Sequence, residues 1–155
     1  MPVDELYMEL ALREAAIAGQ KGEVPIGAVA VWGNDIIAKT HNLRESLNDP
    51  TAHAEILLLK QVSAKLNKWR LKDLRVYVTL EPCLMCAGAL ILARVSTLIY
   101  GADDPKAGAI KSLYNILDDN RLNHRIEVVS GVKGEECGRI LADFFKARRQ
   151  NKSEG

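Results

Sequence analysis

Short runs of β-branched residues alternate with longer stretches of helical periodicity along this chain, and this alternation limits the folds that it can adopt. Residues 24–32 and 36–40 form two such runs around a turn at 33–35, as in a β-hairpin. Further strands are predicted at 74–80, 97–101 and 126–130, and helices at 4–19, 49–66, 82–94, 110–117 and 135–149. A hairpin followed by strand–helix units predicts an α/β domain with three layers, α/β/α, and a mixed central sheet of about five strands.

The size and composition of the chain suit one such domain. Its 155 residues are 48% hydrophobic and 26% charged, which excludes disorder, collagen-like repeats and coiled coil. The longest apolar run, residues 87–93, is far shorter than the ~20 residues that a membrane span needs, so no membrane partner is expected. We expect a single domain over residues 1–155, with a basic helix at about 135–150 and a flexible tail at 151–155.

The three cysteines indicate a reducing compartment. Cys83 and Cys86 are spaced as Cys-x-x-Cys, and Cys137 stands alone. An odd number of cysteines, without the basic and apolar start of an export signal, argues against a disulfide framework. We therefore expect a cytoplasmic protein in which the close pair of cysteines is either a metal clamp or a redox couple.

Two short motifs carry candidate chemistry, and each lies at a predicted helix start. One is His53-Ala54-Glu55 and the other is Pro82-Cys83-Leu84-Met85-Cys86. The two cysteines lie one helical turn apart and can both reach one ion, and His53 can supply a nitrogen from the other helix. One imidazole and two thiolates form a soft ligand set that favours zinc. The positive ends of two helix dipoles would help to keep the thiolates ionised.

The number of ligands distinguishes a structural zinc from a catalytic one. A structural site takes four protein ligands, whereas a catalytic site leaves one position open for water. The candidates for a fourth ligand are Cys137, His41 and His124, and none of them lies in a second short motif. Glu55 is too close to His53 to ligate comfortably from the same turn, and it is better placed to carry protons between an activated water and a substrate. A hydrolytic site is thus favoured over a structural zinc, and a redox pair fits least well.

Six stretches of the sequence carry a resemblance to a known family. They are Gly22–Ala28, Asp49–Glu55, Tyr77–Ala89, Gly101–Asp104, Leu122–Arg125 and the Phe144-Phe145 tail with Arg148-Arg149. Over nearly its whole length the chain resembles the bacterial tRNA-specific adenosine deaminases (the TadA type) of the cytidine deaminase-like superfamily. The resemblance implies a cytidine deaminase-like fold and the zinc-dependent hydrolysis of adenosine to inosine at the wobble position of a tRNA anticodon. It also implies a homodimer in which both subunits shape the RNA site.

The resemblance also assigns roles by position. His53, Cys83 and Cys86 match the ligands of one Zn2+ per chain, and Glu55 matches the proton shuttle. The RNA contacts are predicted in the same way: Asn42 matches a residue that touches the flipped-out nucleotide, and Asp104 and Asn123 match contacts to the anticodon loop.

Positive charge gathers at the C-terminal end of the chain. Residues 139–155 carry a net charge of +3, whereas the rest of the chain carries −2 and the total is +1. Such a local concentration favours contacts to RNA phosphates, which we assign to Arg148 and Arg149. Of Phe144 and Phe145, one is expected to face the core.

Three functions remain open on the residues alone. The first is a tRNA adenosine deaminase, and the second is a deaminase of a free base, nucleoside or nucleotide, of the guanine or deoxycytidylate type. The third is a non-catalytic, zinc-stabilised RNA-binding module. The basic tail and the loop at 123–125 favour a macromolecular substrate over a free base. Glu55 beside an open ligand position argues against a structural site, which has no use for such a carboxylate.

Overall fold

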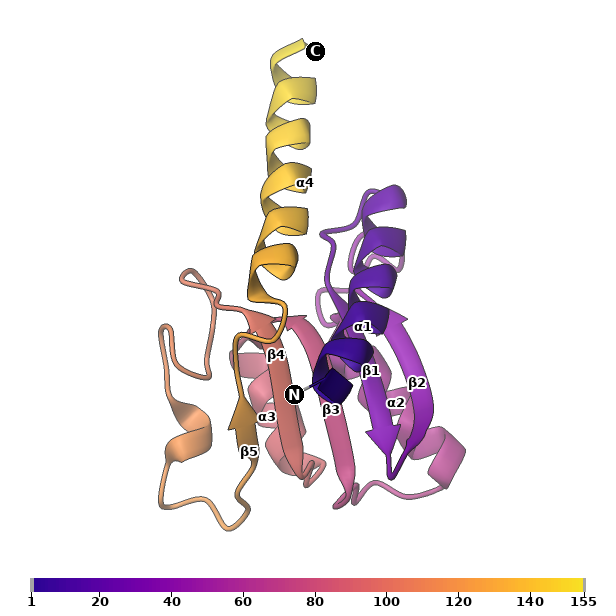
Figure 1. The fold of residues 1–155 in the computed structure, drawn as a ribbon, viewed down its shortest axis with the longest axis vertical. Helices are drawn as coiled ribbons and strands as arrows, with labels where there is room; N and C mark the ends of the chain where they lie inside the picture. The colour runs from indigo at the N-terminus through magenta and orange to yellow at the C-terminus, as the bar shows by residue number, and fades with distance from the viewer. Residues whose placement is uncertain (1, 155) are drawn as a thin grey trace.

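The computed structural model describes residues 2–154 of the chain and has the predicted three-layer α/β/α architecture. In chain order the elements are α1 (Pro2–Gln20), β1 (Gly27–Trp32), β2 (Asp35–His41), α2 (Ala54–Leu66), β3 (Leu74–Leu80), α3 (Leu84–Leu92), β4 (Thr97–Ala102), the short 3-10 helix η1 (Ile116–Asp118), β5 (Glu127–Val129) and α4 (Gly134–Glu154). Figure 1 shows α2 and α3 behind the sheet and α1 in front of it.

The five strands form one mixed sheet in the order β2-β1-β3-β4-β5. β1 pairs in antiparallel fashion with both β2 and β3, whereas β3, β4 and β5 run parallel. The carboxyl ends of the parallel strands therefore lie at one end of the sheet, where α3 begins. The carboxyl end of β2 lies at this same end, because β2 and β3 each pair with β1 in antiparallel fashion.

Two hydrophobic clusters hold the layers together, one on each face of the sheet. In β3, Val76 and Val78 join the cluster that includes Leu58 of α2 and Leu90 of α3. Tyr77 points to the opposite face and joins the cluster that includes Met8 of α1 and, in α4, Cys137. Successive side chains of a strand point to opposite faces, so a strand covered on both sides is apolar throughout. Residues 74–80 come close to this pattern, with Arg75 and Thr79 as the polar exceptions, and their strand was predicted correctly.

One predicted helix is wrong. Residues 110–117 form a loop that ends in the single 3-10 turn η1, because the N–H groups of Tyr114 and Ile116 donate to the carbonyls of Gly108 and Ala109 rather than to those four residues back. The N–H groups of residues 110–112 donate to the carboxylate of Glu81, which fixes the start of this loop.

Other boundaries differ by a few residues. β1 begins at Gly27 rather than at residue 24. A Cβ at Gly27 would lie 2.0 Å from the Ala11 carbonyl oxygen, so the glycine lets α1 pack directly on the strand. At the other end of the chain, α4 runs to Glu154, past the expected end near residue 150, and Gly155 lies outside the described residues.

The expected packing of the phenylalanine pair is also wrong. Phe145 is 39% exposed, Phe144 is half-buried, and neither belongs to a core cluster of the described residues. The reason is visible in Figure 1, where the C-terminal half of α4 extends beyond the sheet and has no layer to pack against. The two rings instead contact each other edge-to-face, with centroids 5.5 Å apart. Within residues 2–154, no helix is long and apolar enough to cross a membrane.

Candidate active site

The two motifs meet where α2 and α3 begin, on the same face of the sheet. His53 is the residue immediately before α2, Cys83 is the residue immediately before α3, and Cys86 lies in the first turn of α3. β3 delivers the cysteine motif directly to this point. The start of α2 is tied to β2 by Thr40, whose hydroxyl donates to the Ala54 carbonyl at 2.8 Å.

The candidate ligand atoms are arranged as a zinc ion requires. Nδ1 of His53 lies 3.6 Å from the Sγ atom of Cys83 and 3.6 Å from that of Cys86, and the three atoms lie within 4.8 Å of one another. Tetrahedral coordination with Zn–S of about 2.3 Å and Zn–N of about 2.0–2.1 Å separates a nitrogen and a sulfur ligand by about 3.6 Å. The residues present therefore fit zinc.

The cluster supplies three ligands, because the other candidates lie elsewhere in the fold. Cys137 is buried in the core cluster on the opposite face of the sheet. His41 pairs with Glu14 at 2.9 Å, and His124 contacts the Val95 carbonyl oxygen at 2.7 Å. Among residues 2–154, His53, Cys83 and Cys86 form the only such group of possible metal ligands. A set of three is typical of a catalytic site with one open position.

Charge is shared among the ligand side chains. The pKa of the Cys83 thiol is lowered to about 4, chiefly by the hydrogen bond from Cys86 and also by that from His53. The same contacts raise the pKa of Cys86 and that of His53. The cluster therefore already carries a thiolate, which is the form of cysteine that binds metal.

Glu55 lies beside the cluster in the first turn of α2 and is only 4% exposed. Burial raises its pKa to about 7, since its own backbone N–H and the Cys86 thiol donate too little to offset the lost hydration. The nearby Cys83 thiolate acts on the pKa in the same direction as burial. A carboxyl group with a pKa near 7 can both accept and release a proton at neutral pH, as general acid–base catalysis requires.

Asn42 lies next to this cluster. It follows β2, is 5% exposed, and lines a small cavity of about 80 Å³ together with His53. Its side-chain nitrogen donates to the Val24 carbonyl at 3.3 Å, and its oxygen accepts from the Arg44 N–H at 3.1 Å. An amide has two donor hydrogens and two acceptor lone pairs, so each end keeps one for a substrate.

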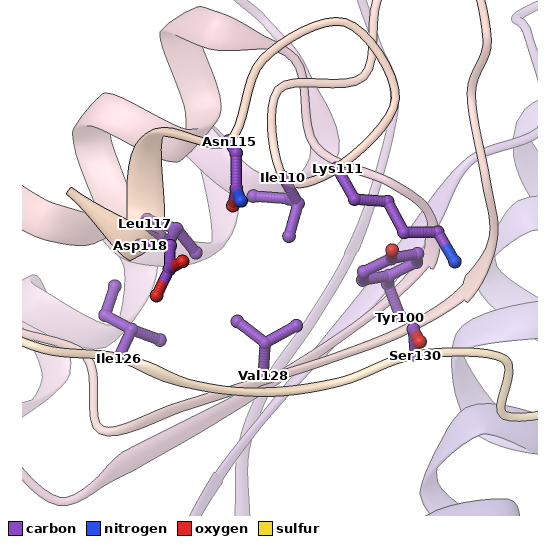
Figure 2. A pocket seen from close by; sticks show the side chains of 9 residues that line it. All are labelled: Tyr100, Ile110, Lys111, Asn115, Leu117, Asp118, Ile126, Val128 and Ser130. Atoms are coloured by element: carbon purple, nitrogen blue, oxygen red, sulfur yellow. The ribbon is translucent and has the colours of Figure 1, made fainter.

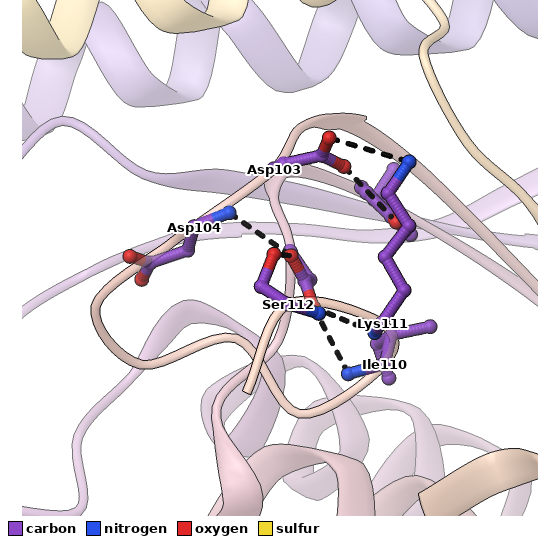
Figure 3. Close-up of polar contacts among 7 residues, drawn as sticks. Asp103, Asp104, Ile110, Lys111 and Ser112 are labelled. Carbon is purple, nitrogen blue, oxygen red and sulfur yellow. Dashed lines mark hydrogen bonds and ion pairs between the residues drawn. The ribbon is translucent and has the colours of Figure 1, made fainter. Parts of the chain in front are cut away.

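Asp104 lies in the loop that follows β4, at the same end of the sheet. Its backbone N–H donates to Glu81 at 3.0 Å, and its Oδ1 accepts from the N–H groups of Lys106 and Ala107. Figure 3 shows the contact of the Asp104 N–H together with Ile110, Lys111 and Ser112, whose N–H groups donate to the same carboxylate. The sequence analysis assigned no role to Glu81. Its position directly before Pro82-Cys83 was the available signal.

The remaining predicted residues are not brought to the cluster within one chain. Asn123 is exposed in the loop before β5. Because β5 is parallel to β4, this loop lies at the opposite end of the sheet from Cys83 and Asp104. Arg148 and Arg149 are exposed on the part of α4 that extends past the carboxyl ends of the strands (Figure 1). The guanidinium of Arg148 lies 5.5 Å from the ring of Phe144.

A larger cavity, of about 320 Å³, lies between β4, β5 and the loop at 110–118 (Figure 2). Its lining includes Tyr100, Lys111, Val128 and Ser130. None of the predicted site residues in the described part of the chain lines it, so the chemistry belongs to the smaller cavity at His53.

Comparisons with known proteins identify relatives of this chain among the deaminases. The model of the MafB19-like deaminase family matches residues 3–149. The chain is 52% identical over 152 residues to the tRNA-specific adenosine deaminase of Bacillus subtilis (strain 168), covering 98% of this chain and 94% of the relative. A structure from a study of A-to-I editing by tRNA:A34 deaminases aligns with a TM-score of 0.84 and 46% identity, over 87% of this chain and 98% of that chain. Guanine deaminase from Nitrosomonas europaea aligns with a TM-score of 0.75 at 22% identity, over 90% and 83% of the two chains, which is a likeness of fold alone.

Proposed function

The chain belongs to the MafB19-like deaminase family and, within it, to the tRNA-specific adenosine deaminases, and from that premise we propose that it converts adenosine to inosine at the wobble position of a tRNA anticodon, with one zinc ion per chain. That it is an enzyme which deaminates adenosine follows from its relatives. The observation that carries the rest is the cluster of His53, Cys83 and Cys86, with the buried carboxyl group of Glu55 beside it.

His53, Cys83 and Cys86 would hold the zinc, through Nδ1 and the two sulfur atoms that face one another in the cluster. Bound zinc supplies Lewis acidity, which makes water nucleophilic at neutral pH. Overall, water adds its oxygen to the purine carbon that bears the amine, the carbon–nitrogen bond breaks, and ammonia leaves.

Glu55 moves the protons of this reaction. Its carboxylate takes a proton from the attacking water and gives it to a ring nitrogen of the purine, which makes the neighbouring carbon more electrophilic. A second transfer protonates the departing amine. The raised pKa near 7 supports this role, since the group then exchanges protons without a large driving force in either direction.

The substrate is an adenine in a single-stranded loop, because a base held in a helical stack cannot reach a recessed site. We assign the contact to the flipped-out nucleotide to Asn42, and the contacts to the loop to Asp104 and Asn123. Arg148 and Arg149 contact phosphates. The position of the two arginines on the part of α4 that extends past the site end of the sheet supports this assignment.

We also propose that the working form is a homodimer in the cytoplasm. Asn123 lies at the opposite end of the sheet from the cluster of its own chain, so a contact to the RNA at that cluster calls for the Asn123 of a second copy. Exposed apolar side chains on the α2–α3 side support the pairing, with Trp69 58% and Leu92 69% exposed. Single-chain material in solution at working concentration, measured by sedimentation, contradicts this part of the proposal.

The test is a choice of substrates. The zinc-loaded protein is incubated separately with total tRNA, free adenosine, guanine and cytidine, and the products inosine, xanthine and uridine are measured. We expect inosine only in tRNA, at the wobble position. Xanthine from guanine, or equal turnover of free adenosine, would replace the proposal by deamination of a free base or nucleoside. Zinc and tRNA binding without any deamination would leave the RNA-binding module.

The phosphate contacts have a separate test. Replacing Arg148 and Arg149 together by alanine should weaken tRNA binding and lower the slope of its log–log salt dependence by up to ~0.7 per lost contact. Zinc content and turnover at saturating tRNA should stay as in the unmodified protein. An unchanged salt slope would mean that this end of α4 is a solvated helix only.

A further inference from the structure

We propose that Glu81 is a positioning residue, which sets the place of Asp104 relative to the metal cluster and thereby controls the affinity for the RNA loop. The inference rests on the proposed function, in which Asp104 contacts the RNA. Glu81 itself touches neither RNA nor metal in this proposal, and it acts through the backbone of the loop that its carboxylate holds.

Glu81 is fixed where the metal-binding segment begins. It follows β3, and the next two residues are Pro82 and the ligand Cys83. Its backbone N–H donates to the Ala102 carbonyl at the end of β4, at 2.8 Å. Its side chain is 2% exposed, so the carboxylate lies beneath the loop that follows β4 rather than in solvent.

The two carboxylate oxygens of Glu81 organise this loop through five hydrogen bonds. Oε1 accepts from the Asp104 N–H at 3.0 Å and from the Ser112 hydroxyl at 2.5 Å. Oε2 accepts from the N–H groups of Ile110, Lys111 and Ser112, at 3.0, 2.9 and 3.0 Å. Figure 3 shows Asp104 on one side of the loop and Ile110 and Lys111 on the other, with Ser112 between them. Both ends of the loop are thus tied to one rigid group.

The loop also closes directly on the metal-binding segment. Gly108 pairs with Cys83 in an isolated antiparallel bridge, and the Ala109 N–H donates to the Pro82 carbonyl at 2.9 Å. A Cβ at Gly108 would lie 2.3 Å from Cδ of Glu81, so only glycine lets the backbone come this close to the carboxylate. The distance between Asp104 and the ligands is therefore set by contacts through Glu81 and its neighbours.

The side chain of Asp104 is oriented by the same turn. Its Oδ1 accepts from the N–H groups of Lys106 and Ala107, and its backbone N–H is the one that Glu81 holds. Its Oδ2 has no hydrogen-bond partner within residues 2–154 and can accept one from an RNA hydroxyl or base. Release of the Asp104 N–H from Glu81 would let the whole turn shift, and Oδ2 would shift with it.

Glu81→Gln separates positioning from mere support of the fold. The glutamine keeps one carbonyl oxygen, which satisfies the most donors when it faces Ile110, Lys111 and Ser112. Its amide nitrogen then faces the Asp104 N–H, and two donors cannot bond to each other. The Ser112 hydroxyl can accept from that nitrogen in place of donating. The substitution therefore removes chiefly the contact to Asp104.

The measurement is steady-state deamination of an anticodon stem-loop by the zinc-loaded full chain. We expect Glu81→Gln to raise KM on the order of 10-fold and to change kcat little, with zinc content unchanged. The matched control is Ser112→Ala, which removes one donor to Glu81 but leaves the Asp104 contact in place. It should lower the unfolding temperature and leave KM as it was.

A double-mutant cycle with Asp104→Ala decides the mechanism. If Glu81 acts through Asp104, then Glu81→Gln has no further effect on KM in the Asp104→Ala background. An equal increase of KM in both backgrounds, an unchanged KM in Glu81→Gln, or an unchanged KM in Asp104→Ala overturns the inference. If Glu81→Gln does not fold, Gly108→Ala disturbs the same contact and takes its place in the cycle. Absence of inosine with the unmodified chain is a different result, because it overturns the proposed function itself.

Discussion

Glu55 and Glu81 are both buried glutamates at the same end of the sheet, yet their surroundings give them opposite properties. The pKa of Glu55 is raised to about 7 by burial, whereas that of Glu81 is held at about 2. Burial acts to raise the pKa of Glu81 as well, but the N–H groups of the loop and the Ser112 hydroxyl outweigh it. The difference lies in the number of donors, since Glu55 has only its own N–H and the Cys86 thiol among the described residues.

The difference in pKa suits the two glutamates to different roles, one in the loop after β4 and one at the metal cluster. A carboxylate that accepts five hydrogen bonds is a permanent charge, which suits a group that holds a loop in place. A carboxyl group with few donors is close to the balance between its two protonation states, which suits a group that carries protons. Burial alone therefore does not mark a catalytic carboxylate, and the donors around it must be counted.

The largest expected effect is on the rate after Glu55 is replaced. Glu55→Ala should lower kcat by ~10²–10⁴-fold, the usual loss when a general acid–base group is removed. Zinc content and unfolding temperature should stay close to those of the unmodified chain, because few hydrogen bonds depend on this carboxyl group. Cys86→Ala is the contrasting variant, which should lose its zinc, whereas Cys137→Ala should keep it. Near-normal turnover in Glu55→Ala would remove its role as a proton carrier.

The second effect is on stability when the other glutamate is removed. Glu81→Ala leaves four backbone N–H groups and one hydroxyl without their acceptor, and each buried donor so orphaned costs ~1–3 kcal/mol. We expect a loss of ~3 kcal/mol or more in the free energy of unfolding, measured by urea denaturation. Glu55→Ala in the same assay should lose far less. Equal losses of unfolding free energy in the two variants would show that the hydrogen bonds to Glu81 do not stabilise the fold more than those to Glu55.

A third prediction concerns the close approach of Gly108 to Glu81. Gly108→Ala places a methyl group against the carboxylate and should destabilise the fold by ~1–3 kcal/mol, as overpacking usually does. The matched control is Gly138→Ala in α4, where the nearest atom to the added Cβ is 4.0 Å away. That variant should gain ~0.5–1 kcal/mol, because alanine is the better helix former. Both are measured as midpoints of urea unfolding.

How much of this could be predicted from the sequence differs between the two regions. The cluster of His53, Cys83 and Cys86 was accessible because short motifs at helix starts determine which side chains can converge. The role of Glu81 could not be predicted from the sequence, since its partners are mostly backbone N–H groups. Almost every residue type has such a group, so the sequence does not show which ones bind a carboxylate. The wrong helix at 110–117 has a similar cause, because the pattern of apolar residues there was helical but the N–H groups of Tyr114 and Ile116 donate to the carbonyls of Gly108 and Ala109.

The strands show the same division. Residues 74–80 and 97–101 were predicted well, because both segments are mostly apolar, as a strand covered on both faces is. The position of Asn123 could have been anticipated in part, since a loop before a parallel strand lies opposite the carboxyl ends of its neighbours. The resemblance to a family assigns a role to each matching residue. It does not tell which copy of the chain in a dimer supplies that residue to a given site.

The smallest expected effect concerns a third glutamate, Glu23, and tests the contrast between a carboxylate with many donors and one with few. Glu23 is fully buried and lies far from Cys83 and Cys86 in the sequence. It accepts from the N–H of Glu45 at 2.9 Å and from the N–H and hydroxyl of Ser46, each at 2.5 Å. Burial acts to raise the pKa of Glu23, but the Ser46 hydroxyl and the two N–H groups more than offset it and hold the pKa below 4.5. Glu23 therefore belongs with Glu81 rather than with Glu55.

The sign of its pH dependence follows from that lowered pKa. A carboxyl group whose pKa is lower in the folded than in the unfolded state stabilises the fold fully above its unfolded value, and the contribution fades as the pH falls through the folded value. Glu23→Gln should thus be less stable than the unmodified chain by ~1–3 kcal/mol at neutral pH. The difference between the two should shrink as the pH is lowered below 4.5. Urea unfolding of both chains over this pH range is the measurement. A difference that grows in acid would place Glu23 with Glu55, as a group whose charge the fold disfavours.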